Sequence, residues 1–240
     1  MPDHVFSPRP GLDVTVREAG SGTPVLLLHG GAGPASVDTL FTHLAAGHRA
    51  IAPVHPGFED TTRPDDLDTV AGLARLYLDL LADIGVTGVT VVGVSFGGWV
   101  AAELALADSG KRVARLVLID SIGPRIAGHT VRMPSGPPPG AHTGALRRGP
   151  SPAAMAALTT YTGPDMQDHT LLDRIRTLRI PALLIWGEND PVISPDFGRA
   201  YAEAFPDSRF ALIPGGGHLP MREAPEQTFA ALDTFLTERG

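Results

Sequence analysis

Short apolar runs alternate along the chain with longer segments of helical spacing. Continuous apolar runs at residues 23–28, 87–94 and 181–186 have the length and composition of strands that are buried on both faces. Shorter or weaker runs of the same kind lie at residues 14–16, 49–53, 113–119 and 210–213. We interpret these runs as the strands of a mostly parallel sheet.

The segments between these runs have the spacing of amphipathic helices. Residues 67–84 place apolar side chains three and four positions apart, and Gly85 follows as a stop signal. Further helices are predicted at residues 37–47, 96–107, 195–205 and 224–237. Strands that alternate with helices predict a sheet covered on both faces, with its ligand site at the carboxyl ends of the strands.

One stretch, residues 123–152, interrupts this alternation. It is rich in proline and glycine, including the run Pro-Pro-Pro-Gly at 137–140, and can form neither a regular helix nor a central strand. A short helix is predicted at 151–161, with Ser151 as its cap and Pro152 at its first position. We predict that residues 122–172, approximately, form a cap inserted into a single domain spanning 1–240; a plain surface loop is the alternative.

Composition narrows the range of functions. A chain of 240 residues, 43% hydrophobic and 19% charged, suits one α/β domain with a sizeable core. The net charge of -7 disfavours nucleic acid and membrane surfaces as partners, and the absence of cysteine excludes disulfides and thiolate chemistry. With neither a signal-peptide pattern nor a membrane-length apolar run, we expect a cytoplasmic monomer or homodimer that acts on a small molecule.

The first candidate for chemistry is Ser95, in the sequence Gly-Val-Ser-Phe-Gly at 93–97. The motif follows a predicted strand and precedes a predicted helix, which places the serine on a sharp turn at the edge of the sheet. Glycines two positions on either side fit this turn, since side chains there would collide. The alternative is a tight turn whose serine has no chemical role.

A serine nucleophile needs a general base, and the base needs an acid that orients it. Among nine histidines, His218 has the most suitable setting, because it follows the last predicted strand through the loop Pro-Gly-Gly-Gly at 214–217. For the acid we expect Asp190, in the loop after the strand at 181–186. Glu188 in the same loop, and Asp120 at the end of the strand at 113–119, are the alternatives.

Negative charge on a carbonyl oxygen needs preorganised donors. The backbone amide of Phe96, directly after the serine, is one candidate; the amide of Gly31, in the loop after the strand at 23–28, is the second, with Ala32 as its alternative. Gly30 in the same loop lets the backbone approach a substrate closely. We expect His29 to be structural.

These motifs together resemble the α/β-hydrolase superfamily over nearly the whole chain. The resemblance rests on His-Gly-Gly at 29–31, the motif at 93–97, Gly-Glu-Asn-Asp at 187–190 and Gly-Gly-His at 216–218, in the order serine, acid, histidine. It implies an α/β-hydrolase fold with an eight-stranded, mostly parallel sheet, helices on both faces and a cap after the sixth strand. It also implies a triad of Ser95, Asp190 and His218 and an oxyanion hole at Gly31 and Phe96.

The segment at 54–59 departs from the family pattern, because it lacks the usual acid and second glycine. We expect His55 and Phe58 of this segment to line the entrance to the site. The residues expected to contact substrate are Gly30, Ala32, His55, Phe58 and Leu219.

The predicted chemistry is acyl transfer by a serine hydrolase acting on a small ester, lactone or thioester. The motifs indicate no metal site and no cofactor, and the glycines near 93 do not form a dinucleotide fingerprint. A lyase, cyclase or acyltransferase that uses the triad for acid-base chemistry is the second hypothesis, and a non-catalytic ligand-binding protein is the third.

The predicted cap also carries an excess of positive charge. Its arginines are Arg125, Arg132, Arg147 and Arg148, against Asp165 and Asp168. A basic cap could attract an anionic substrate; a solvated polar cap is the alternative.

Overall fold

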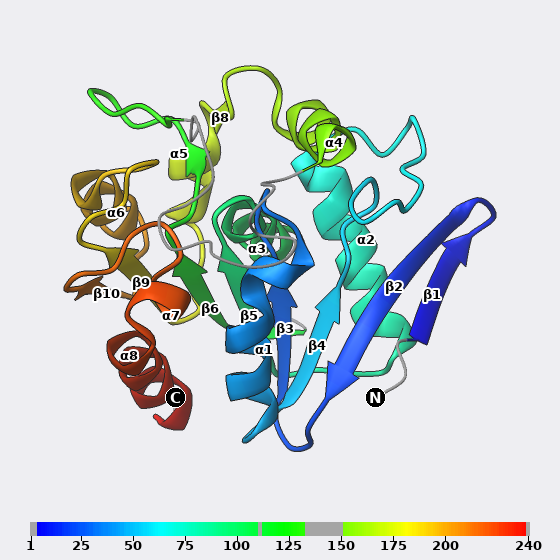
Figure 1. Ribbon diagram of the computed structural model, residues 1–240, viewed down its shortest axis with the longest axis horizontal. Coiled ribbons are helices and arrows are strands. Elements are labelled where there is room, and N and C mark those ends of the chain that lie inside the picture. The colour runs from blue at the N-terminus through cyan, green and yellow to red at the C-terminus, as the bar shows by residue number, and fades with distance from the viewer. Residues whose placement is uncertain (1–3, 110–111, 133–150, 239–240) are drawn as a thin grey trace.

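The computed structural model describes residues 4–109, 112–132 and 151–238. Its main feature is an eight-stranded sheet with the order β1-β2-β4-β3-β5-β6-β9-β10 (Figure 1). β2 is antiparallel to both of its neighbours, and the remaining pairs are parallel. The predicted fold class, a mostly parallel eight-stranded sheet between helices, is confirmed.

The strands are β1 His4–Arg9, β2 Leu12–Ala19, β3 Pro24–Leu28, β4 Arg49–Pro53, β5 Val89–Val94, β6 Val113–Ile119, β7 Gly123–Pro124, β8 Gln167–Asp168, β9 Ala182–Gly187 and β10 Ser208–Ile213. The helices are the 3-10 helix η1 Pro34–Val37, then α1 Asp38–Ala45, α2 Val70–Asp83, α3 Phe96–Ala107, α4 Pro152–Thr162, α5 Leu171–Ile175, α6 Pro195–Ala202, α7 Pro220–Glu223 and α8 Pro225–Thr237.

The central strands are mostly apolar because the sheet has a hydrophobic core on each face. Successive side chains of a strand point to opposite faces, so in β3 Leu26 and Leu28 pack in one core while Val25 and Leu27 pack in the other. Helices α2 and α3 cover the first face, and α1 and α8 cover the second (Figure 1). The continuous apolar runs of the sequence are therefore strands buried on both sides.

No apolar run in the sequence corresponds to the edge strand β1. It pairs antiparallel with β2, its register shifts between Phe6 and Arg9, and most of its side chains are exposed. An edge strand packs on one face only and tolerates proline, here Pro8, so it lacks the apolar run by which the inner strands are recognised.

Helix ends follow local capping. α2 begins at Val70 rather than at Leu67, because the Thr69 side chain accepts a hydrogen bond from the amide of Gly72 at 3.1 Å. Ser151 caps α4 in the same way through the amide of Ala154, as its sequence predicted.

The segment after β6 leaves the main sheet and returns to it before β9. Its two ends meet where β7 pairs in parallel with β8, Gly123 with Gln167 and Pro124 with Asp168. Helix α4 lies between them in the chain and sits beyond the carboxyl ends of β3 and β4 (Figure 1). Residues 133–150 of the predicted cap lie outside the described residues, and the proposed domain division stays a prediction.

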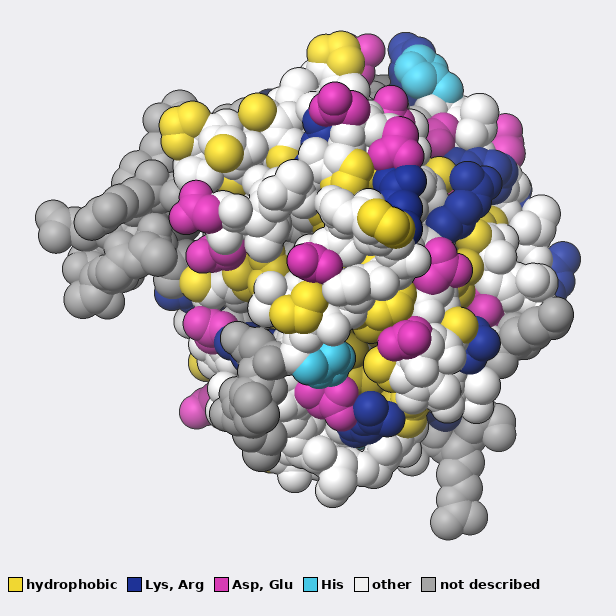
Figure 2. Space-filling view, turned by 90° about the vertical axis from the view of Figure 1, so that its right-hand side faces the viewer, with side chains coloured by type: hydrophobic (Ala, Val, Ile, Leu, Met, Phe, Trp, Pro, Cys, Tyr) yellow, Lys and Arg dark blue, Asp and Glu magenta, His cyan; other side chains and the backbone are white. Residues whose placement is uncertain are grey.

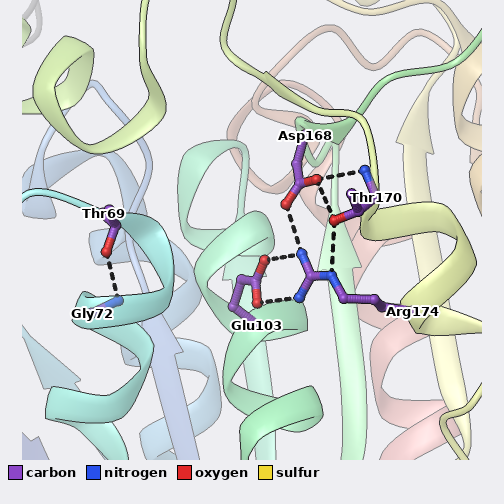
Figure 3. Close-up of polar contacts among 6 residues, drawn as sticks. All are labelled: Thr69, Gly72, Glu103, Asp168, Thr170 and Arg174. Atoms are coloured by element: carbon purple, nitrogen blue, oxygen red, sulfur yellow. Dashed lines mark hydrogen bonds and ion pairs between the residues drawn. The ribbon is translucent and has the colours of Figure 1, made fainter.

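An ion-pair network joins this segment to the core. The Arg174 guanidinium in α5 donates to both carboxylate oxygens of Glu103 in α3, at 2.6 and 2.7 Å, and to Asp168 in β8 at 2.6 Å (Figure 3). The Glu103 side chain is 7% exposed, so this pairing is shielded from water on the side of α3. The network ties α3 to β8 and α5, which follow it by about seventy residues in the sequence.

The surface beside β1 carries acidic and basic side chains interspersed with small apolar patches (Figure 2). Val5, 60% exposed, is the one largely exposed large apolar side chain of the described part of the chain. None of the described helices combines the length and the apolar character needed to cross a membrane.

Candidate active site

Ser95 lies between the end of β5 and the start of α3, in a conformation that side chains rarely adopt. Its φ is 53° and its ψ is -117°, in the left-handed half of backbone space that favours glycine. The glycines around it make this turn possible: a Cβ on Gly93 would lie 2.3 Å from the Gly97 carbonyl oxygen, and one on Gly97 would lie 2.2 Å from the Leu28 carbonyl oxygen. The predicted strand-turn-helix setting of Ser95 is what the structure has.

His218 and Asp190 lie next to Ser95, although they are far from it in sequence. His218 Nε2 is 2.9 Å from Ser95 Oγ, and His218 Nδ1 is 2.8 Å from Asp190 Oδ2. The second oxygen of Asp190 accepts hydrogen bonds from the amides of Val192 at 2.7 Å and Ile193 at 3.2 Å. With its side chain 0% exposed, Asp190 is a fixed, desolvated acceptor for the imidazole.

The two alternative acids occupy different positions. Glu188 is exposed and accepts a hydrogen bond from the amide of Gly215 at 3.1 Å, on the outside of the loop. Asp120 is buried beside Asp190, and its Oδ1 accepts from the amide of Gly187 at 2.9 Å. The structure thus brings Asp190, rather than either alternative, into hydrogen-bond contact with His218.

The predicted oxyanion donors belong to two segments that adjoin the serine, the start of α3 and the loop after β3. Phe96 is the first residue of α3, where backbone amides point out of the helix end. Gly30 packs directly against Ser95, since a Cβ on it would be 3.0 Å from the Ser95 Cβ. Gly31 follows, half-buried, and Ala32 is exposed. Of the two candidates for the second donor, Gly31 is thus the more buried, and the oxyanion hole stays a prediction.

Two buried histidines support the loop after β3 from behind. His29 Nε2 accepts from the amide of His55 at 3.0 Å while His29 Nδ1 donates to the Gly30 carbonyl at 2.8 Å; His55 Nε2 in turn donates to the His29 carbonyl at 2.9 Å. The Tyr77 hydroxyl in α2 donates to His55 Nδ1. These bonds need both imidazoles neutral, and burial lowers the pKa of His29 to about 4 and that of His55 well below its usual value.

This support corrects one expectation about the segment at 54–59. His55 is 0% exposed and Phe58 is 1% exposed, and both rings pack against His29. They lie behind the loop, not at an entrance to the site. The residue types of this segment cannot tell these two places apart, because the difference depends on how the loop after β3 folds onto the segment after β4.

Helix α4 contributes two residues that the sequence did not identify. A Cβ on Gly31 would lie 2.8 Å from a methyl group of Leu158, so Leu158 covers Gly31 directly. The Tyr161 hydroxyl donates to the Pro56 carbonyl at 3.0 Å, and its ring stacks on Phe96 at 5.9 Å. Leu219, predicted to contact substrate, is buried at 8% exposure beside His218.

Of the arginines in the predicted basic cap, the structure describes Arg125 and Arg132. Arg125 Nη1 lies 3.1 Å from His169 Nδ1, and the backbone amide of Arg132 donates to the Val192 carbonyl at 2.8 Å. Asp168 is paired with Arg174. Arg147 and Arg148 lie outside the described residues, and the basic-cap hypothesis stays a prediction.

Asp120, Asp190 and His218 form the one group of potential metal ligands in the described part of the chain, with one ligand atom of each within 4.8 Å of the others. Two of the three are already engaged, because Asp190 Oδ2 and His218 Nδ1 bond each other. The group thus consists of the predicted triad acid and base, with a second carboxyl group beside them.

Comparison with known proteins agrees with this fold. The profile of the Alpha/beta hydrolase family matches residues 25–232. A 2-hydroxy-6-oxo-6-(2'-aminophenyl)hexa-2,4-dienoic acid hydrolase of Metapseudomonas resinovorans is 26% identical over an alignment 259 residues long, gaps included. The alignment covers 95% of this chain and 89% of the relative. A 2-hydroxy-6-oxo-2,4-heptadienoate hydrolase of Pseudomonas putida is 36% identical over 123 residues, 47% of this chain and 42% of the relative.

Among solved structures, an esterase from Rhodococcus sp. ECU1013 superposes with a TM-score of 0.77 at 26% identity, over 100% of both chains. The family profile spans the sheet from β3 to β10 together with the loops that carry Ser95, Asp190 and His218. The chain therefore belongs to the α/β-hydrolase family.

Proposed function

We propose that the protein is a serine hydrolase that forms an acyl-enzyme on Ser95 from a small-molecule ester, lactone or thioester. The observation that carries this proposal is the continuous hydrogen-bond chain from Ser95 Oγ through His218 to Asp190, at 2.9 and 2.8 Å. A serine hydroxyl gains nucleophilicity when a base can accept its proton as it attacks.

Each group has a defined part in the proposed reaction. His218 Nε2 takes the hydroxyl proton while Ser95 Oγ bonds to the substrate carbonyl carbon, and Asp190 stabilises the imidazolium that forms. The amides of Phe96 and Gly31 donate to the carbonyl oxygen as it gains negative charge. His218 then gives its proton to the leaving group; a water molecule, deprotonated by the same nitrogen, releases the acid and restores Ser95.

An active-site serine probe tests the proposal. The wild type is treated with a fluorophosphonate and its intact mass is measured, alongside Ser95→Ala and the control Ser7→Ala. Ser7 lies on β1 and bonds to Asp13, remote from His218. We expect one label on the wild type and on Ser7→Ala, none on Ser95→Ala, and a loss of roughly 10⁴-fold or more in kcat for ester hydrolysis by Ser95→Ala.

Two results would contradict this proposal in different ways. An unlabelled wild type would show that Ser95 is not activated, which leaves a ligand-binding role. A Ser95→Ala protein that still turns over its substrate would favour lyase, cyclase or transferase chemistry without a covalent step.

The relatives favour a second candidate substrate class. The names of the two hydrolases described above specify oxo-dienoic acids, which carry both a ketone and a carboxylic acid. Attack of Ser95 Oγ on such a ketone would break the bond between the carbonyl carbon and the dienoic acid chain. His218 Nε2, which holds the proton taken from Ser95, would give it to the carbon that leaves. Rates measured on matched neutral esters, acidic esters and 6-oxo-dienoic acids distinguish the two; a preference of about 10-fold or more for the oxo acids would favour the second.

A further inference from the structure

The carboxyl group of Asp120 lies buried next to the triad acid. Asp120 directly follows β6, has a φ of 42°, and is 0% exposed. Its Oδ1 accepts a hydrogen bond from the amide of Gly187 at 2.9 Å. Its Oδ2 is buried and has no donor among the described residues. An ionised carboxylate would leave this oxygen desolvated and unpaired, which is costly.

The charged groups around Asp120 also disfavour ionisation. Those that face it are Asp190 from the loop after β9, with His218 beside it, and Glu223 from the end of α7. Burial first, and then the Asp190 carboxylate, raise the pKa of Asp120 well above its usual value. Two adjacent carboxylates rarely both ionise, so one of this pair holds a proton.

The hydrogen bonds decide which of the two holds it. Asp190 accepts from the amides of Val192 and Ile193 and from the His218 ring, all of which favour its charged form. Asp120 has a single amide donor, on Oδ1. The remaining atom, Oδ2, is buried without a partner in the described part of the chain, and a carboxyl oxygen of Asp190 lies within 4.8 Å of an Asp120 oxygen.

We propose that Asp120 is a positioning residue: a neutral carboxylic acid whose Oδ2 hydroxyl donates a hydrogen bond to the Asp190 carboxylate. This bond holds Asp190 in the orientation that it needs to contact His218 Nδ1, and it keeps the pair of acids at one negative charge. The positioning part of the inference rests on the proposed hydrolase function, whereas the protonation of Asp120 does not.

Infrared difference spectroscopy at neutral pH tests the protonation without any turnover. The spectrum of Asp120→Asn is subtracted from that of the wild type, and Asp108→Asn serves as the control. Asp108 is a buried aspartate at the opposite end of α3 whose oxygens accept from the amides of Arg112 and Val113. We expect Asp120→Asn to remove the carbonyl band of a neutral carboxylic acid, and Asp108→Asn to remove a carboxylate band. Loss of a carboxylate band in Asp120→Asn would overturn the proposal.

The pH profile of kcat/KM tests the positioning role. An asparagine can reproduce the proposed bonds, with its oxygen accepting from Gly187 and its NH₂ group donating to Asp190, so Asp120→Asn is expected to keep the wild-type acidic limb. Asp120→Leu removes both bonds and is expected to lower kcat by about 10- to 100-fold. The recovery of activity from leucine to asparagine is a result that a merely space-filling role would not give.

An ionised Asp120 would give the opposite pattern. Replacing a charged neighbour of the triad by neutral asparagine would destabilise the imidazolium and move the midpoint of the acidic limb down by about one pH unit or more. That shift would overturn the proposal. Inactivity of the wild type on every substrate would count against the hydrolase function alone, because the infrared result stands apart from turnover.

Discussion

At the scale of single residues, Ser95 shows that the site depends on a backbone conformation of unfavourable free energy. A non-glycine residue held at positive φ costs of order 1–3 kcal/mol, which the surroundings must offset. Here the Ser95 amide donates to the Ile119 carbonyl at 2.9 Å, and the Ser95 carbonyl accepts from the amide of Gly98 at 3.0 Å. The strained turn is thus fixed on one side by β6 and on the other by α3.

The buried histidines predict a loss of stability as the pH falls from 7 toward 5. The unfolded chain takes up protons near pH 6.5, whereas burial holds the pKa of His29 at about 4 and that of His55 far below the usual value. The folded state therefore binds fewer protons in this range, and each histidine lowers the free energy of unfolding at pH 5 by roughly 2 kcal/mol. Urea unfolding at several pH values measures this slope.

Substitution of single histidines identifies the residues that cause the pH dependence of the free energy of unfolding. His55→Gln should make the slope between pH 7 and pH 5 shallower, because one of the two protonation sites is gone. His43→Gln is the control, since His43 is partly exposed on α1 and pairs with Asp233. Equal slopes for His55→Gln and the wild type would contradict the prediction.

At the scale of elements, the apolar pattern predicted the parts of the fold that lie inside it. β5 and β9 are buried at each position because both faces are covered, and α2 shows a regular stripe because one face is buried. β1, α5 and α7 have no such signal: β1 is an exposed edge, and the two helices span five and four residues. Their formation depends on tertiary contacts that sequence spacing does not encode.

The same distinction holds for the site. Ser95, Asp190 and His218 could be placed because each follows a strand, and the carboxyl ends of parallel strands share one edge of the sheet. The position of Leu158 over Gly31 could not be predicted, because it depends on how α4 packs across more than a hundred residues of chain.

Helix α4 predicts a limit on the size of the acyl group. Leu158 is 3% exposed and touches Gly31, so Leu158→Ala opens space beside the proposed oxyanion donor. We expect kcat/KM for a branched acyl ester to rise relative to an acetyl ester by about 10-fold. The free energy of unfolding should fall by about 2–4 kcal/mol, because the substitution leaves a cavity.

Thr159→Ala on the exposed face of the same helix is the matched control, and it should change neither quantity. An unchanged preference between the two esters in Leu158→Ala would show that the acyl group lies elsewhere.

At the scale of the whole molecule, Arg174 joins the segment after β6 to the core. Its guanidinium contacts α3 through Glu103 and β8 through Asp168, while its own backbone belongs to α5 (Figure 3). When one partner of an ion pair is desolvated, loss of either charge lowers the free energy of unfolding, because the remaining group is left without its counter-ion.

Glu103→Gln is therefore expected to lower the free energy of unfolding by about 1–3 kcal/mol, measured by urea denaturation. Asp173→Asn is the control: Asp173 is 88% exposed and lies 3.8 Å from Arg176, so its loss should cost less than about 0.5 kcal/mol. Equal effects of the two substitutions would show that the Arg174 network does not hold the molecule together.

The short pairing of β7 with β8 affects how such a chain can change in evolution or by design. Because residues 123–124 and 167–168 bind each other, the polypeptide departs from the scaffold and rejoins it at one point. The stretch in between can be lengthened, shortened or replaced at small entropic cost, without changing how β6 pairs with β9. Exchange of this one segment can thus change the contacts over Gly31 and Phe96 while the strands that carry Ser95, Asp190 and His218 stay the same, and a designer can graft a segment from a relative at the same junction.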